Sequence, residues 1–168
     1  MRYGLLSVLV VVLLCLSGCG YTMGTDSPSV LAPEEKGVVP TLKIRGIDNP
    51  TMFAWLPHIL RTQLRDEIAA RGLARWVDSG PADYEISVRV DKLTFRSWMS
   101  QTEYVTLLYS PSMTMSLTIY KGNTADVVWR SKNESYSQTY ESINEQTAAT
   151  VLARELIRRL TTGMRQAF

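Results

Sequence analysis

Cysteine and histidine are the scarcest reactive residues in this chain of 168 residues, which contains two cysteines and one histidine. Cys15 and Cys19 both lie near the N-terminus, so no thiol remains in residues 20–168. That stretch therefore offers no disulfide, no thiolate metal site and no cysteine nucleophile. The single histidine, His58, follows Pro57 and has no partner histidine for a metal site, so a surface or capping role is expected.

Sequence patterns of common catalytic sites are also missing. The chain has no HExxH, GxSxG, CxxC, P-loop or GxGxxG pattern. Its adjacent carboxylates, Glu34-Glu35 and Asp66-Glu67, fit solvated charge better than a general acid and base. The formal net charge is only +2, which is too small to create a strong positive electrostatic field for nucleic acid. We therefore predict a protein that is not an enzyme and binds no nucleic acid, metal or cofactor.

The one long apolar run, Leu5 to Leu16, is shorter than the roughly 20 residues of a membrane-spanning helix. Its length and its end in Leu16-Ser17-Gly18-Cys19 are typical of a bacterial lipoprotein signal peptide with a lipobox. We expect residues 1–18 to be removed and Cys19 to carry a diacylglyceryl group and an N-acyl chain, which tether the protein to a membrane. An uncleaved anchor with a chance cysteine is the alternative.

Residues 19–37 are predicted to be the lipidated N-terminus and a flexible linker, because Gly, Pro, Ser and acidic residues dominate residues 24–37. A single domain is expected over residues 38–168. A first strand is predicted from Val39 to Ile47, and a helix is indicated by apolar residues four apart, at Leu56, Leu60, Leu64 and Ile68.

From Tyr84 the apolar period changes to two, which predicts long strands. The phase slips near Asp91-Lys92, where a bulge is expected, and Pro111 requires a second bulge or a sheet edge. A returning strand begins at Val127, and Ser142 to Glu145 reads as a capping box before a last helix. The order predicts an α+β fold, a two-layer sandwich with two helices on one face of a mainly antiparallel sheet of four to five strands.

The second face of the long strand has an unusual composition. Its even positions are mostly hydroxylic and carry no charge: Thr106, Leu108, Ser110, Ser112, Thr114, Ser116, Thr118 and Tyr120. Threonine favours strands, so an ordinary solvent-facing surface explains this row. The alternative is a face that contacts another polar surface, such as the lumen of a barrel.

Basic residues gather around the turn that follows this strand, at Lys121, Arg130 and Lys132, with Lys92 and Arg96 across the predicted sheet. Such a patch could bind the phosphates of an anionic glycolipid. The alternative is a sheet edge charged against strand addition.

Four of these features together resemble the LptE family, the lipopolysaccharide-assembly lipoproteins of Gram-negative outer membranes. They are Cys19-Gly20-Tyr21, the strand end Ile47-Asp48-Asn49-Pro50, the helix entered at Pro57 and closed at Arg71-Gly72, and Val127-Val128-Trp129-Arg130. Thr22-Met23 departs mildly from the family pattern.

The resemblance implies a protein without catalytic activity that plugs the LptD β-barrel at about 1:1, helps to assemble it, and binds lipopolysaccharide. Candidate lipopolysaccharide contacts are Lys121, Arg130 and Lys132, chosen by charge and position. Gly20 after the cysteine favours the periplasmic side of the outer membrane. The alternative function is a pilotin-like accessory lipoprotein that helps another envelope machine, such as a secretin, to assemble.

Overall fold

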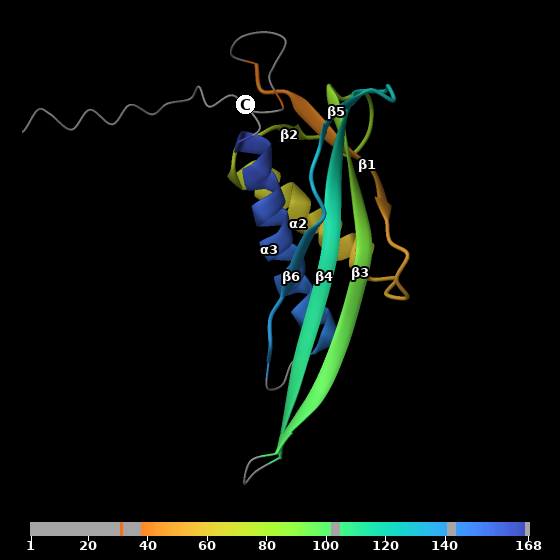
Figure 1. Ribbon diagram of the computed structural model, residues 1–168. Helices are drawn as coiled ribbons and strands as arrows, with labels where there is room; N and C mark the ends of the chain where they lie inside the picture. Colours follow the sequence, from red (N-terminus) through yellow and green to blue (C-terminus); the bar gives the residue numbers. More distant parts are fainter. Residues whose placement is uncertain (1–30, 32–37, 102–104, 141–143, 167–168) are drawn as a thin grey trace, which may run out of the picture.

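The computed structural model describes residues 31, 38–101, 105–140 and 144–166. Six strands and two helices occur within these ranges (Figure 1). Their order is β1 (Thr41–Asp48), α2 (Leu56–Ala70), β2 (Arg75–Trp76), β3 (Tyr84–Gln101), β4 (Val105–Lys121), β5 (Val127–Arg130), β6 (Glu134–Ser137) and α3 (Glu145–Gln166).

The strands form one mixed sheet with the order β2-β1-β3-β4-β5, and β6 also pairs with β4. The hairpin of β3 and β4 is its antiparallel centre, and β5 and β6 pair antiparallel with the other edge of β4. β1 pairs parallel with both β2 and β3, because α2 carries the chain back before each of those strands begins. The predicted α+β class is confirmed.

Two details of the sheet follow from particular residues. The register of β3 and β4 shifts between Val90 and Lys92, as the change of phase predicts. The returning segment divides into β5 and β6, which raises the strand count to six. At the break, Ser131 donates its N–H to the Leu117 carbonyl, and its hydroxyl accepts from the Leu117 N–H, both at 2.9 Å.

Pro111 lies in β4 opposite Phe95, with no register shift there. Its carbonyl accepts a bond from the Gln138 N–H at 3.4 Å, so the main-chain groups of Pro111 point away from β3. β6 ends beside it at Ser137. Neither a bulge towards β3 nor an open edge is observed, because Ser137, Gln138 and Tyr140 flank this part of β4 on its other side. The proline nevertheless costs the β3–β4 hairpin no hydrogen bond, since its main-chain groups point away from β3.

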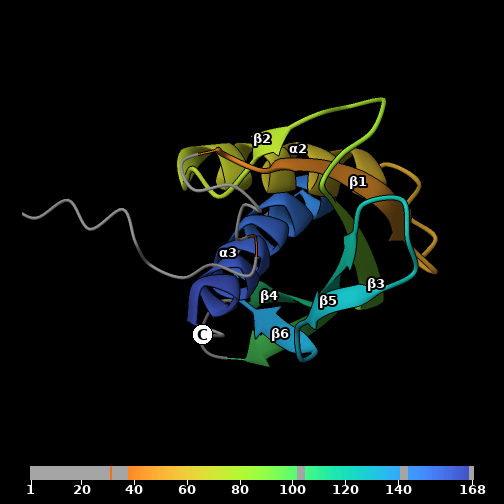
Figure 2. The ribbon, with the colours of Figure 1, turned by 90° about the horizontal axis from the view of Figure 1, so that it is seen from above.

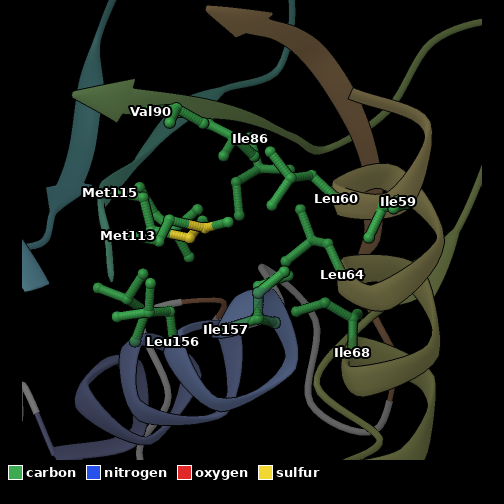
Figure 3. Close-up of a cluster of buried hydrophobic side chains, with 14 of the residues drawn as sticks. Ile59, Leu60, Leu64, Ile68, Ile86, Val90, Met113, Met115, Leu156 and Ile157 are labelled. Atoms are coloured by element: carbon green, nitrogen blue, oxygen red, sulfur yellow. The ribbon is translucent and has the colours of Figure 1, made fainter. Parts of the chain in front are cut away.

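Both helices cover the same face of the sheet (Figure 2). The predicted stripe of α2 and the apolar side of α3 are buried against odd-numbered residues of β4, including Met113 and Met115, and against Ile86 and Val90 of β3 (Figure 3). The helical period of 3.6 and the strand period of two thus meet in one apolar core. None of the helices in the described ranges is long and apolar enough to cross a membrane.

The last helix begins later than the capping-box pattern predicts. Asn144 is the N-terminal cap: its side-chain oxygen accepts from the Gln146 N–H at 2.8 Å, and its carbonyl accepts from the Ala148 N–H at 2.9 Å. Ser142, the cap that the pattern favours, lies outside the described residues. Asparagine serves as well as serine here, since either side chain can accept the free N–H groups of the first turn.

Leu31, within the predicted linker, is buried in the core with only 1% of its surface exposed. We expect Leu31→Ala to lower the free energy of unfolding by about 2 kcal/mol, near the lower end for buried leucines because the site lies outside the regular elements. Chemical denaturation measures this. Val38→Ala is the control, because Val38 is 55% exposed and its truncation should cost almost nothing. Equal effects would place Leu31 outside the core.

Asp83 joins the starts of β1 and β3. Its carboxylate accepts from the Thr41 N–H and hydroxyl, both at 2.7 Å, and these bonds lower the pKa of Asp83. A lowered pKa means that the contribution is complete above pH 4 or so and is lost as the pH falls through the folded-state pKa. We expect Asp83→Ala to cost about 1 kcal/mol at pH 7, because exposure screens the pair, and to cost less in acid. Urea unfolding at both pH values measures the difference.

Candidate functional site

The face of the sheet opposite the helices is rich in hydroxyl groups, and we call it the hydroxyl face. Its hydroxylic members are even residues of β4 and their cross-strand neighbours on β3 and β6: Ser110, Ser112, Thr114, Ser116, Thr118, Ser87, Thr94, Ser135 and Ser137. The β3 neighbours of Ser110, Thr114 and Ser116 are basic residues on the same face, namely Arg96, Lys92 and Arg89. The β4 members are all half-buried, whereas Met113, Met115 and Leu117 between them are fully buried on the other face. The predicted separation of the two faces is therefore observed; the side chain of Thr106 lies outside the described residues.

Hydroxyls on this face bond to each other across the strands. Thr94 and Ser112 share a hydrogen bond of 2.8 Å, and the Thr114 hydroxyl donates to Ser135 at 3.1 Å. Each hydroxyl still has capacity to donate or accept, because the group offers one donor and two acceptor positions. The serines and threonines of the face are thus polar, short and able to bond to either donors or acceptors on an opposing surface.

The hydroxyl face is hollowed towards the β1 end of the sheet. A concavity of about 730 Å³ lies over β1, β3, β4 and β5. Its lining combines hydroxyls and charges, namely Ser87, Ser116, Thr118, Tyr120, Asp48, Arg89, Asp91 and Arg130 among others. Sugars and phosphates are the ligands that such a mixture can hydrogen-bond.

The two arginines of the concavity, Arg89 and Arg130, differ in their ion pairs. Arg89 Nε lies 3.1 Å from an Asp91 carboxylate oxygen and 3.9 Å from one of Asp48. Arg130 lies opposite Thr118, and it has no ion pair with any residue in the described ranges. Arg130 is therefore the cation of the concavity that remains available for an anion from outside.

A polar cluster forms the rim of the concavity beside Tyr120. Glu85 is only 7% exposed and accepts from Lys43 Nζ at 3.0 Å, with Arg45 at 3.5 Å. Arg45 also stacks over the Tyr120 ring at 4.4 Å and donates to the Thr124 carbonyl at 2.7 Å. These contacts hold the β4–β5 turn against the first strand and fix one wall of the concavity.

The structure separates the three basic residues that the sequence grouped together. Arg130 lines the concavity, whereas Lys121 and Lys132 are exposed residues that do not. Lys121 continues the odd-numbered series of Ile119, so its position belongs to the helix side of β4. Lys132 follows the end of β5. Cys19, the predicted lipidation site, lies outside the described residues.

Sequence reasoning missed Arg89 and Asp48, which line the concavity together with Arg130, and Glu85, which lies opposite Tyr120 at its rim. The alternation of β3 indicates which face Glu85 and Arg89 share, but nothing in the sequence specifies that β1 pairs parallel with β3 and brings Asp48 beside Arg89. No group of histidine, cysteine, aspartate and glutamate residues suited to a metal ion occurs in the part of the chain that the structure describes.

Comparison with known proteins gives one family match. The family model described as "LptE: Lipopolysaccharide-assembly" matches residues 39–164, which span both helices almost completely and all six strands. No curated protein sequence matches the chain.

Solved structures with a similar fold are distant in sequence. A putative lipoprotein from Caulobacter crescentus is 15% identical with a TM-score of 0.52, and the match covers 74% of this chain and 88% of the other. The PelC dodecamer from Paraburkholderia phytofirmans is 15% identical with a TM-score of 0.51, covering 73% and 89%. At this identity the likeness concerns the fold alone.

Proposed function

Because the chain belongs to the LptE family of lipopolysaccharide-assembly proteins, we propose that it is a lipid-anchored component of the outer-membrane lipopolysaccharide translocon. In this role it occupies the lumen of an LptD-like β-barrel, at about one copy per barrel, and helps that barrel to assemble. It also binds lipopolysaccharide during transfer to the outer leaflet. The family is not an enzymatic one, and the role needs no catalytic residue.

The hydroxyl face carries the proposal. The interior of a large membrane barrel is polar, so a domain inside it is expected to present polar groups that can bond to the barrel wall. The half-buried serines and threonines of β4 meet this requirement, because short hydroxylic side chains allow close approach and can donate or accept. A plain solvent-facing surface needs neither property.

Arg130 supports the second part of the proposal. Arginine binds phosphate oxygens through a planar fork of donors, and lipopolysaccharide carries phosphates in its lipid A and core regions. Arg130 meets this need inside a concavity whose other cation, Arg89, is held by Asp48 and Asp91. Lys121 and Lys132 lie outside the concavity and are proposed as weaker, peripheral contacts.

We expect Arg130→Ala to weaken binding of purified lipopolysaccharide about fivefold, the equivalent of about 1 kcal/mol for an exposed charge–phosphate contact. Lys132→Ala should have a smaller effect, and both variants should melt like the wild type because both side chains are exposed. Fluorescence titration measures the affinities. An effect of Lys132→Ala equal to that of Arg130→Ala would argue against the concavity as the binding site.

Anchoring is proposed to come from acylation of Cys19 and to place the domain on the periplasmic side of the outer membrane. Depletion of the protein in its bacterium tests the function as a whole. The proposal predicts that new lipopolysaccharide fails to reach the cell surface and that the partner barrel is lost. Normal surface lipopolysaccharide with a defective secretin would instead support a pilotin-like role.

A further inference from the structure

The outer edge of β3 lacks a strand partner over half its length. β1 pairs with β3 only as far as Asp48 and Arg89, after which Asn49 turns the chain away by bonding to Thr51 and Phe53. In the ranges that the structure describes, no strand pairs with this edge beyond Arg89. In Figure 1 the hairpin continues well past both helices.

Main-chain groups on this edge can be assigned from the bonds of β4. Odd residues of β4 point towards β5 and β6, because the Leu117 N–H donates to Ser131 and Tyr109 exchanges two bonds of 2.8 Å with Tyr140. Even residues of β4 therefore bond with β3, and their partners Lys92, Thr94 and Arg96 point towards β4. The main-chain N–H and C=O groups of the intervening Leu93 and Phe95 consequently point away from β4, towards the open edge.

Side chains along the same edge specify what could pair with it. Lys92 and Arg96 are exposed on the hydroxyl face, on either side of Thr94, and have no ion pair in the described part of the chain. Leu93 is buried and Phe95 packs on the helix side, where its ring meets Phe53 at 5.3 Å. An incoming strand would need acidic residues on one face and apolar residues on the other.

A second copy of this chain does not satisfy that requirement. Antiparallel pairing of two β3 edges centred on Thr94 would set Lys92 opposite Arg96 of the second copy, twice in the same interface. Like charges directly opposite each other destabilise a strand pair. In this register the two cations oppose self-pairing, whereas they attract an acidic strand.

We propose that the Lys92–Ser97 edge of β3 binds an extended segment of a partner protein by strand addition, with acidic residues four apart opposite Lys92 and Arg96. The N–H and C=O groups of Leu93 and Phe95 bond to the incoming main chain. The proposal concerns a surface distinct from the concavity and does not depend on the function proposed above.

A synthetic peptide of sequence Thr-Glu-Val-Thr-Val-Glu-Thr is the probe, because it places two glutamates four apart on one face and two valines on the other. We expect it to bind the acylated full chain in detergent below about 1 mM and to slow amide exchange at Leu93 and Phe95 about tenfold. The same peptide N-methylated at both valines keeps its side chains but cannot pair, so it should bind at least about tenfold more weakly.

Charge reversal gives an independent readout. Lys92→Glu with Arg96→Glu should weaken binding of the glutamate peptide about tenfold and improve binding of a peptide with lysines in place of its glutamates. Arg61→Glu with Arg65→Glu is the matched control, since both arginines are exposed four apart on α2. No binding of the glutamate peptide, equal binding of the methylated peptide, or unchanged exchange at Leu93 and Phe95 would overturn the proposal.

Discussion

Replacing Ser112 by arginine is expected to release the protein from the β-barrel proposed as its partner. Ser112 is half-buried at the middle of the hydroxyl face, where it bonds to Thr94 and lies opposite Ser137. The neighbouring charged residues of β3, two positions to either side of Thr94, are the cations Lys92 and Arg96, so an arginine here is added to a basic part of the face. If this face lies against the barrel lumen, a long unpaired cation is forced into the contact.

We expect a cost of about 3 kcal/mol, which corresponds to a loss of affinity of about 100-fold. Recovery of the barrel from mild-detergent extracts measures the loss. Ala69→Arg is the control, because Ala69 is exposed near the end of α2 and an arginine there suits the helix dipole. Both variants should fold, as judged by melting temperature. Undiminished recovery with Ser112→Arg would show that another face contacts the barrel.

Gly122→Ala should be the most damaging single-methyl substitution for stability. A Cβ at Gly122 would lie 2.9 Å from the Ala82 carbonyl carbon and 3.0 Å from the Asp83 oxygen, and closer still to the Ala82 oxygen. These are main-chain atoms, which cannot move aside as a side chain can. The Gly122 N–H also donates to the Asp83 carbonyl at 2.7 Å, so displacing the turn breaks that bond.

Overpacking and the lost hydrogen bond together should cost about 4 kcal/mol. Gly163→Ala provides a control: the chemical change is the same, but the expected effect on the free energy of unfolding has the opposite sign. Its Cβ would meet only the Trp129 ring at 3.9 Å, an ordinary contact, and alanine favours the interior of α3 by about 0.5–1 kcal/mol. Urea denaturation of both variants measures the difference. Equal stability of the two would mean that the β4–β5 turn does not approach Ala82 as described.

Much of the fold is readable from local periodicity. Leu56, Leu60, Leu64 and Ile68 are buried as their spacing of four predicts, and the bulge lies where the phase of β3 slips. Periodicity reports which face a residue occupies but not which strand lies beside it. The parallel pairing of β1 with β3 therefore cannot be predicted from the sequence. The same holds for the burial of Leu31, a lone leucine in a stretch of loop composition.

The candidate site shows the same division. The alternation of β4 located the hydroxyl face, since every even residue from Ser110 to Thr118 shares one side of the strand. Charge and closeness along the chain grouped Arg130 with Lys121 and Lys132, yet only Arg130 lines the concavity. Closeness in sequence does not decide which side of a sheet a side chain occupies. The pairing of Arg130 with Thr118 does, because it places Arg130 on the hydroxyl face.

Co-purification of the acylated protein from mild-detergent extracts of its own bacterium tests the central claim most directly. The account predicts that a large outer-membrane β-barrel protein is recovered with it in about equal molar amount and that this recovery falls in the Ser112→Arg variant. Isolation of the protein without a barrel, or with the subunits of a different envelope machine, would contradict the account.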